Sequence, residues 1–258
     1  MATLPNPLPQ LAADPTGRAL GLDLPPGTVV RAPEPLLWYA DDAADPEDWP
    51  TVRSAARGAG LLPFLIDTGG SQRGPEEWEL MPDEMSYPGD HDAEEVLADF
   101  WEEYAPQEAD SDGWPGLAPA PARALGADPD TRAAEAAAVL LTTGWFKAPR
   151  LALAPARRSA DLPAAIGWSG PLNHENDVAR LCAVLRSWED RFGLRVVALG
   201  FDRLAASVAS PPATLAEAEA IAVEHYAFCP DTVDQGPGSL DDYAESLVDE
   251  GIWSFWWD

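Results

Sequence analysis

The sequence predicts an α/β protein, with a compact mixed sheet and helices in its C-terminal domain and a βαβ-like acidic region before it. Short apolar runs alternate with segments whose apolar residues recur at helical spacing. A hydrophobic content of 46% with eleven Trp, in 258 residues, is enough for a packed core. An α+β arrangement, in which strands and helices segregate, is the alternative.

The N-terminal part carries the signals of two strands and two helices. A strand is expected at residues 36–40, a helix at 49–59 and a second strand at 61–66. This order, within about 30 residues, is typical of a βαβ unit. Apolar residues at helical spacing predict an amphipathic helix over 93–104. We assign residues 1–105 to an acidic N-terminal α/β region.

The next segment, residues 106–130, is rich in Pro, Ala, Gly and Asp. This composition is typical of a linker or a long surface loop. Regular patterns return after it, so residues 131–258 are assigned to a C-terminal α/β domain. The sequence leaves open whether the two halves share one core.

The C-terminal domain has clear local signals. The segment 177–192 has one apolar stripe and ends at Gly193, a typical helix terminator. Thr214 and Glu217 form a capping box that opens another helix. A two-residue turn predicts an antiparallel hairpin in the middle of the domain. Helices are expected at about 131–141, 160–166, 177–192, 214–228 and 240–248, and strands at 151–153, 195–201, 204–209 and 253–257.

The charge is strongly negative: 44 acidic residues face 16 basic ones, for a net charge of −28. Such a field repels nucleic acid and anionic membranes, so we expect no nucleic-acid and no membrane partner, whereas a basic protein partner is favoured. The sharpest block, residues 76–112, holds fifteen carboxylates and no Lys or Arg. Coding bias is the alternative explanation, because Lys147 is the only lysine in the chain.

The sequence favours a cytoplasmic protein. No apolar run approaches the ~18–20 residues that span a bilayer. The first residues lack the basic start and apolar core of a signal peptide. Cys182 and Cys229 are isolated, which suits a reducing compartment. The oligomeric state is not determined by these features.

A series of short motifs follows a fixed order over about residues 150–258. They are Gly167-Trp168, LRSWEDRFG at 185–193, Pro211-Pro212, EHYAFCPD at 224–231, Gln235-Gly236 and FWWD at 255–258. Together they resemble the bacterial family termed domain of unknown function 4253, in its longer actinobacterial type. The resemblance implies a compact α/β domain and brings no assigned reaction. It also implies that Gln is accepted at the position of His225, which argues against an indispensable histidine.

Three residues near the C-terminus are the candidate catalytic residues: His225, Cys229 and Asp231. His225 and Cys229 are four apart, so one helical face presents both, as in a thiolate–imidazole pair. The structural alternative is favoured, because the same face is otherwise apolar and a buried Cys behaves as a small hydrophobic residue.

Two metal sites are also conceivable, although we expect no metal and no cofactor. A zinc site needs four ligands, which the chain supplies only at unusual spacing as His174, Cys182, His225 and Cys229. A calcium or magnesium site needs oxygen ligands, for which the candidates are Asp231, Asp234, Asp241 and Asp242. The alternative for these aspartates is local: they favour a turn and the first turn of a helix.

Two functions are consistent with these features. The first is a cytosolic interaction or inhibitor protein of the immunity type, whose acidic surface binds a basic partner. Its steering charges are Glu94, Glu95, Asp99, Glu102 and Glu103. The alternative is an enzyme, a hydrolase or a metal-assisted catalyst, with its site around Cys229, His225 and the 231–242 loop. The first is favoured because no nucleophile–base–orienter set is recognisable.

Overall fold

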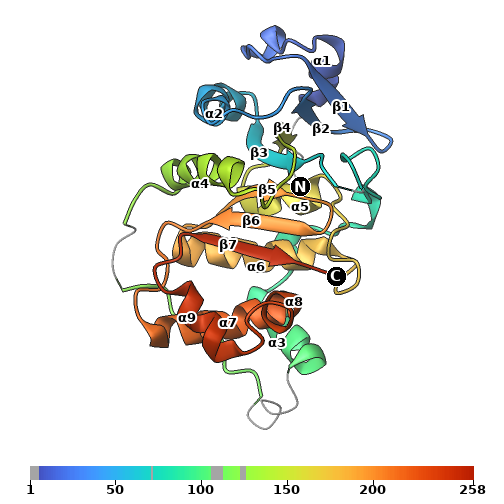
Figure 1. Cartoon of the computed structure of the whole chain (residues 1–258). Helices are drawn as coiled ribbons and strands as arrows, with labels where there is room; N and C mark the ends of the chain where they lie inside the picture. Colours follow the sequence, from blue (N-terminus) through green and yellow to red (C-terminus); the bar gives the residue numbers. More distant parts are fainter. Residues whose placement is uncertain (1–5, 71, 106–112, 123–125) are drawn as a thin grey trace.

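The computed structural model describes residues 6–258 except residue 71 and the segments 106–112 and 123–125. Over these residues, seven strands form one mixed sheet in the order β1-β2-β4-β3-β5-β6-β7, seen in Figure 1. Helices cover it, which confirms the predicted α/β class. The strands are β1 (Gly27–Arg31), β2 (Pro35–Ala40), β3 (Leu61–Asp67), β4 (Pro149–Pro155), β5 (Arg195–Leu199), β6 (Arg203–Ser207) and β7 (Ile252–Trp256).

The helices fall close to the positions that the apolar periodicity predicts. The α-helices are α1 (Leu8–Ala13), α2 (Asp48–Gly58), α3 (Ala93–Tyr104), α4 (Pro129–Thr143), α5 (Leu162–Ala165), α6 (Val178–Phe192), α7 (Leu215–Phe228), α8 (Asp231–Asp234) and α9 (Leu240–Leu247). Short 3₁₀ turns are η1 (Arg18–Leu20), η2 (Pro82–Glu84), η3 (Pro88–Asp90) and η4 (Ser159–Asp161). Among the helices of the described residues, none combines the length and the apolar character needed to cross a membrane.

The strand β3 occupies a central place in the sheet. It pairs antiparallel with β4 along its whole length and parallel with β5 at Leu65 and Ile66. Because β2 is also antiparallel to β4, β2 and β3 run parallel with β4 between them. The strand–helix–strand unit predicted for residues 36–66 is therefore a split one, whose two strands are not neighbours.

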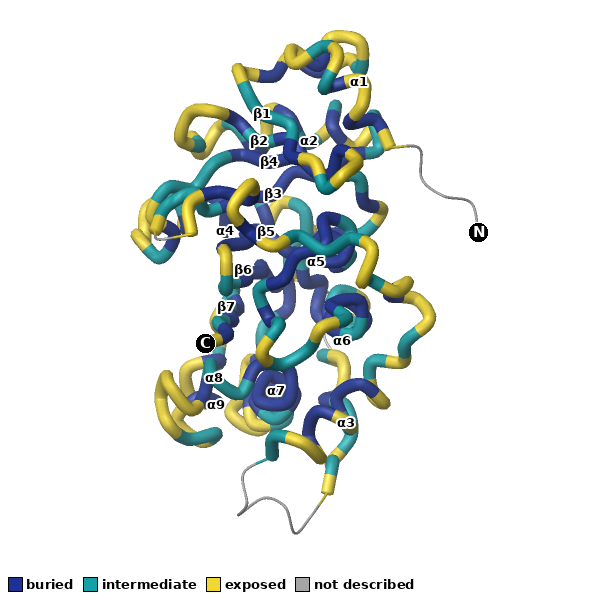
Figure 2. The backbone as a smooth tube through the Cα atoms, turned by 90° about the vertical axis from the view of Figure 1, so that its right-hand side faces the viewer, coloured by how far each residue is buried: buried dark blue, intermediate teal, exposed yellow. Residues whose placement is uncertain are grey.

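The two faces of the sheet carry different helices. α4 packs on β5 and β6, and α5 and α6 lie on the opposite face, as Figures 1 and 2 show. α6 buries its predicted apolar stripe, including Leu181, Leu185 and Trp188. Gly193 ends the helix with a φ of 67°, a left-handed conformation that glycine adopts without strain. The local signals of this helix thus define both its buried face and its end.

The edge strand β7 closes the core with aromatic rings. Trp253 and Phe255 are buried, and Ser254 and Trp256, which alternate with them, are half-buried, as expected for a strand with one face on the core. The ring of Phe255 stacks on Trp188 of α6 at a centroid distance of 5.5 Å. β7 therefore holds α6 against the sheet.

Residues from both halves of the chain share the main core. It joins Leu37, Phe64 and Phe100 to Trp188 and Phe255. A smaller cluster lies around α1 and α2. The division into 1–105, 106–130 and 131–258 stays a prediction, and parts of the expected linker, 106–112 and 123–125, lie outside the described residues.

Candidate functional site

His225, on α7, and Cys229, the residue that caps the end of α7, are both completely buried. Nδ1 of His225 forms a hydrogen bond with the Tyr243 hydroxyl at 3.0 Å. The Cys229 thiol donates to the carbonyl oxygen of Trp256 at 3.0 Å and accepts from the Thr232 hydroxyl at 3.1 Å. The pair thus faces the core, as the apolar pattern around it predicts.

Burial also fixes the charge of both groups. Burial, together with the positive charge of Arg191, lowers the pKa of His225 to about 3. Burial raises the pKa of Cys229 to about 12. At neutral pH the site holds a neutral imidazole and a protonated thiol, whereas nucleophilic catalysis needs a thiolate. The arrangement stabilises the core and supplies no nucleophile.

The candidate aspartates lie on two helices, not in one loop. Asp231 and Asp234 belong to α8, and Asp241 and Asp242 to the first turn of α9. Asp231 accepts hydrogen bonds from Gln235 and from the backbone N–H of Asp258, each at 3.0 Å. Asp234 accepts from the Tyr226 hydroxyl, and Asp242 from the N-cap Ser239. Each of these three carboxylates has a local structural partner.

The described residues bring together no group of three or more His, Cys, Asp or Glu side chains that could hold a metal ion. Cys182 is buried on α6, where burial raises the pKa of its thiol. His174 lies against the rings of Phe100 and Tyr104, at centroid distances of 4.5 and 4.4 Å, and burial lowers its pKa to about 4. The two-His, two-Cys set considered for zinc is therefore not assembled among the described residues.

The helix α3 presents the five predicted steering carboxylates to solvent. Asp92 caps its start by accepting hydrogen bonds from the backbone N–H groups of Glu94 and Glu95. Its apolar face is buried against α6 and α7. The exposed residues are Glu94, Glu95, Asp99, Glu102 and Glu103. Within the described part of the chain, one of them has an ion pair: Asp99 with Arg180, at 2.7 Å.

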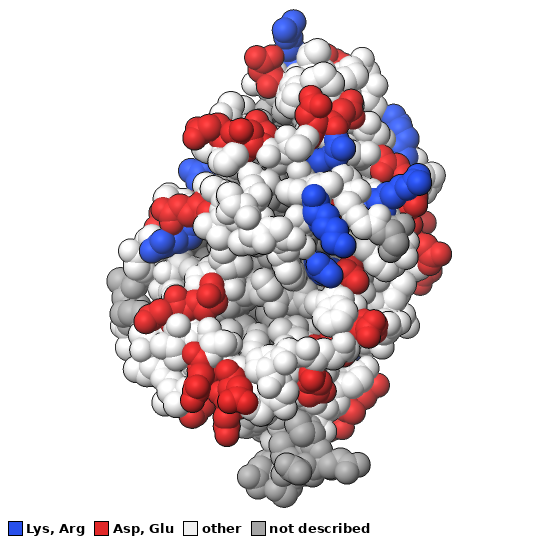
Figure 3. All heavy atoms as spheres, in the orientation of Figure 1, with Lys and Arg blue, Asp and Glu red and all other residues white. Residues whose placement is uncertain are grey.

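A second acidic segment joins α3 in space. Arg203 is the last basic residue of the chain, and eleven carboxylates follow it. Eight of these carboxylates lie on α7, α8 and α9, and α7 packs directly against α3. We call this region, α3 with α7–α9, the acidic end (Figure 1). On the face shown in Figure 3, that end carries Asp and Glu and no Lys or Arg.

One buried carboxylate anchors the acidic end to the rest of the molecule. Glu224 of α7 is fully buried and binds Arg191 of α6 through both of its oxygens, at 2.7 and 2.6 Å. It also accepts from Trp188 Nε1 and from the backbone N–H of Ala118. Arg191 donates in turn to the carbonyl oxygen of Ala118. This network fixes α6, α7 and the segment around Ala118 to one another.

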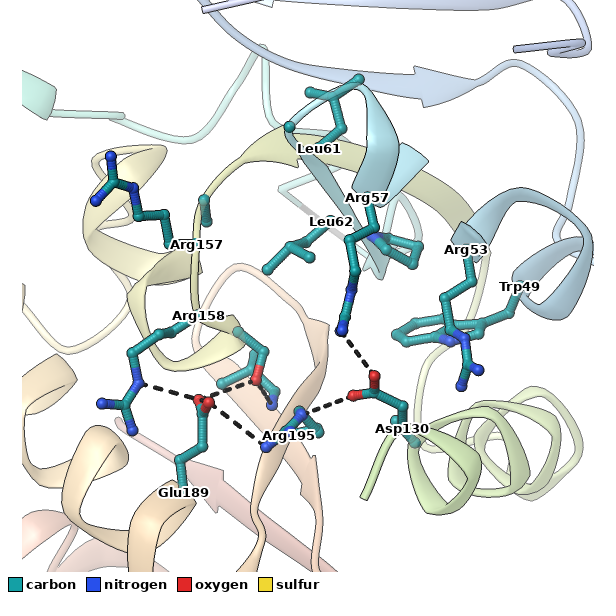
Figure 4. A pocket seen from close by; sticks show the side chains of 16 residues that line it. Trp49, Arg53, Arg57, Leu61, Leu62, Asp130, Arg157, Arg158, Glu189 and Arg195 are labelled. Atoms are coloured by element: carbon teal, nitrogen blue, oxygen red, sulfur yellow. Dashed lines mark hydrogen bonds and ion pairs between the residues drawn. The ribbon is translucent and has the colours of Figure 1, made fainter. Parts of the chain in front are cut away.

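A cavity of about 340 Å³ lies at the amino ends of β3 and β5. Its charged lining residues are Arg53, Arg57, Arg157, Arg158, Arg195, Asp130 and Glu189 (Figure 4). We call it the arginine-lined pocket. Sequence reasoning missed it because the arginines come from three separate segments. The signal that was present, an excess of Arg over Lys, also fits coding bias.

A second cavity, of about 750 Å³, borders the same segment and shares Arg157 and Arg158 with the pocket. Its other lining residues are largely apolar and include Met85, Tyr87 and Pro88. Arg186 lies over the Tyr87 ring at 5.1 Å and is held by Asp161. The larger cavity is therefore less charged than the arginine-lined pocket beside it.

Comparison with known proteins gives one match. No curated protein and no solved structure matches the chain. Residues 150–258 match the model of the family described as "Domain of unknown function (DUF4253)". The match begins at β4 and includes α5 to α9 and β5 to β7. It confirms the resemblance inferred from the motifs: residues 150–258 of this chain match the DUF4253 family model.

Proposed function

We propose that the protein is an interaction or inhibitor protein of the immunity type, which binds a basic protein partner through its acidic end. One observation carries this proposal: α3 and α7 come from two stretches without Lys or Arg, 74–122 and 204–258, and they pack against each other at the acidic end. Coding bias explains a negative chain as a whole. It does not explain why the described elements of both stretches pack together.

The acidic end is also rigid, which suits recognition. α3 is capped at its start and anchored by Val96, Leu97, Phe100 and Trp101. Its carboxylates are therefore held on a fixed surface before a partner arrives. Preorganised charges of one sign accelerate the encounter with an oppositely charged partner and select against others.

The enzymatic alternative gains no support from the site around Cys229. Both candidate side chains are buried, and neither carries a charge at neutral pH. In our proposal the protein acts in the cytoplasm, where its two free cysteines, both buried, stay reduced.

Affinity capture at two salt concentrations tests the proposal. Tagged protein is incubated with lysate of its own source organism at about 50 and 500 mM salt. Interactions between exposed charges are weakly screened at the lower concentration and strongly screened at the higher one. The test variant carries E94Q, E95Q, E102Q and E103Q. The matched control removes four exposed carboxylates elsewhere, as D23N, E34Q, D42N and E47Q.

We expect a basic partner that the wild type and the control retain at low salt. The α3 variant should lose it, and high salt should release it from the wild type and the control, because exposed charges are screened. A partner that survives high salt and the α3 variant would sink the proposal. So would the absence of any stoichiometric basic partner.

A further inference from the structure

The arginine-lined pocket is braced by two carboxylates. Asp130, at the start of α4, binds Arg57 at 2.7 Å and Arg195 at 2.9 Å. Figure 4 shows the two guanidinium groups approaching the two sides of this carboxylate. Asp130 thus ties α2 and β5 to α4, and it fixes two cations at the wall of the cavity.

Glu189 of α6 also holds two arginines, on the other side of the pocket. Arg158 Nε and Arg195 Nη1 each lie 3.5 Å from its Oε1. Arg158 is held further by Asp190 and by the carbonyl oxygen of Arg186. Among the described residues, Nη2 of Arg195 and Nη1 of Arg158 have no hydrogen-bond partner. The braces therefore orient these arginines while leaving donors free.

The charges of the pocket do not balance. Five arginines and two carboxylates line it, and Asp190 outside the lining also pairs with Arg158, which leaves an excess of two positive charges. Guanidinium groups keep their charge at any physiological pH. Arg53 and Arg157 form no ion pair with any described residue, and Arg157 points away from the other four in Figure 4. A purely structural network would need no such excess, least of all in a chain of net charge −28.

The positive charge of the pocket affects a neighbouring carboxylate. Asp128, the N-cap of α4, is exposed beside the pocket. Hydrogen bonds from Thr131 lower the pKa of Asp128, and the charges of Arg53 and Arg195 lower it further. Trp49 forms part of the wall, and its Nε1 is buried without an acceptor among the described residues.

We propose that the arginine-lined pocket binds a small, multiply charged oxyanion, with a phosphoryl group as the best fit. Arginine donors arranged as forks match phosphate and carboxylate oxygens in pairs. A cavity of about 340 Å³ is at the small end of metabolite sites, which suits a small ligand. A polycarboxylate offers the same chemistry as a phosphate, and the probes must separate the two.

Calorimetric titration of the full chain with pyrophosphate and with citrate tests this site. The test variant, R53Q with R57Q, removes two cations of the pocket and leaves Asp130 paired with Arg195. The matched control, R18Q with R31Q, removes two exposed arginines that do not line the pocket. We expect the test variant to bind at least about tenfold more weakly, as for the loss of a charge-assisted hydrogen bond, and the control to bind as the wild type does.

The two probes identify the chemistry. Tighter binding of pyrophosphate would support a phosphoryl ligand, and tighter binding of citrate would overturn that preference in favour of a polycarboxylate. Absence of binding of both probes at about 1 mM, a weak affinity for a metabolite, would overturn the site. So would equal weakening in the control variant.

A stability measurement without ligand keeps the proposal testable if the double variant unfolds. Arg53 has no ion pair to lose, so R53Q alone should keep or raise the thermal midpoint by relieving repulsion. Addition of pyrophosphate should raise the midpoint of the wild type more than that of R53Q. A lower midpoint in R53Q without ligand, with equal shifts on addition, would assign Arg53 a structural role instead.

Discussion

The acidic end and the arginine-lined pocket carry opposite charges and are built in different ways. At the acidic end, carboxylates stand on the solvent face of α3 and α9, and in α3 the apolar face beneath holds the helix in place. In the pocket, arginines from α2, β5 and the segment after β4 meet around two carboxylates that brace them. The first is a surface, and the second is a partly open pocket.

The two kinds of charge are stabilised in different ways. Exposed carboxylates need no partner, because water solvates them and each adds only a small repulsion. Arg158 and Arg195, which are half-buried, need fixed counter-charges, which Glu189 and Asp130 supply. Removing a carboxylate should therefore change the stability of the fold in opposite directions in the two regions. The loss of a carboxylate buried beneath the acidic end should change stability more than either.

The largest effect is expected at Glu224, the one carboxylate of the acidic end that is fully buried. E224Q leaves Arg191, whose side chain is only 14% exposed, without its counter-charge. Breaking a buried pair in this way costs about 3–5 kcal/mol. Urea unfolding measures it, with the exposed E219Q on the same helix as a control that should change stability by less than about 0.5 kcal/mol. Equal effects would mean that the network contributes no more than surface charge.

A second prediction concerns pH. The folded pKa of His225 is about 3, below its unfolded value of about 6.5. Below pH 6.5, His225 binds a proton in the unfolded chain but not in the folded chain. The neutral, buried His225 therefore makes its full contribution to the free energy of unfolding above pH 6.5. This contribution decreases toward pH 3, by up to about 1.4 kcal/mol per pH unit.

H225Q should remove this dependence. Its free energy of unfolding, followed by urea titration between pH 6.5 and 5, should fall less steeply than that of the wild type. His174 keeps part of the slope in both proteins, because its pKa is also lowered, to about 4. An identical slope in H225Q and wild type would show that His225 does not stay neutral in the folded protein.

The smallest effects compare one carboxylate from each region. E102Q should raise stability by about 0.2–0.5 kcal/mol at low salt, because Glu102 lies one turn from Asp99 on α3 and like charges repel there. E189Q should lower it by about 1–3 kcal/mol, because Arg158 and Arg195 lose a charged acceptor. Shifts of the same sign in paired urea titrations would break the comparison between the two regions.

Local signals account for most of what the sequence predicts correctly. Gly193 ends α6, Thr214 caps α7 through its hydrogen bond from the Glu217 N–H, and the turn between β5 and β6 gives the expected antiparallel pair. The shared face of His225 and Cys229 likewise predicts their burial. Each of these depends on residues only a few positions apart.

Features set by distant contacts could not be predicted in this way. The position of β3 between β4 and β5 depends on pairing between segments far apart in the chain. The arginine-lined pocket could not be predicted for the same reason, because Arg57, Arg158 and Arg195 come together only when that sheet has formed. The contribution of α7–α9 to the acidic end was missed because the charges after Arg203 are more dilute than those of residues 76–112.

The place of β3 bears on how this chain acquires its fold. β4 and β5 both lie in the segment that matches the family model, yet the position between them in the sheet is occupied by β3, which is synthesised much earlier. The domain is continuous in sequence but interrupted in space. Its two pieces join only when an upstream segment is placed between them, and such long-range pairing makes folding slow. Until that happens, β4 and β5 each expose an edge to which another chain can pair.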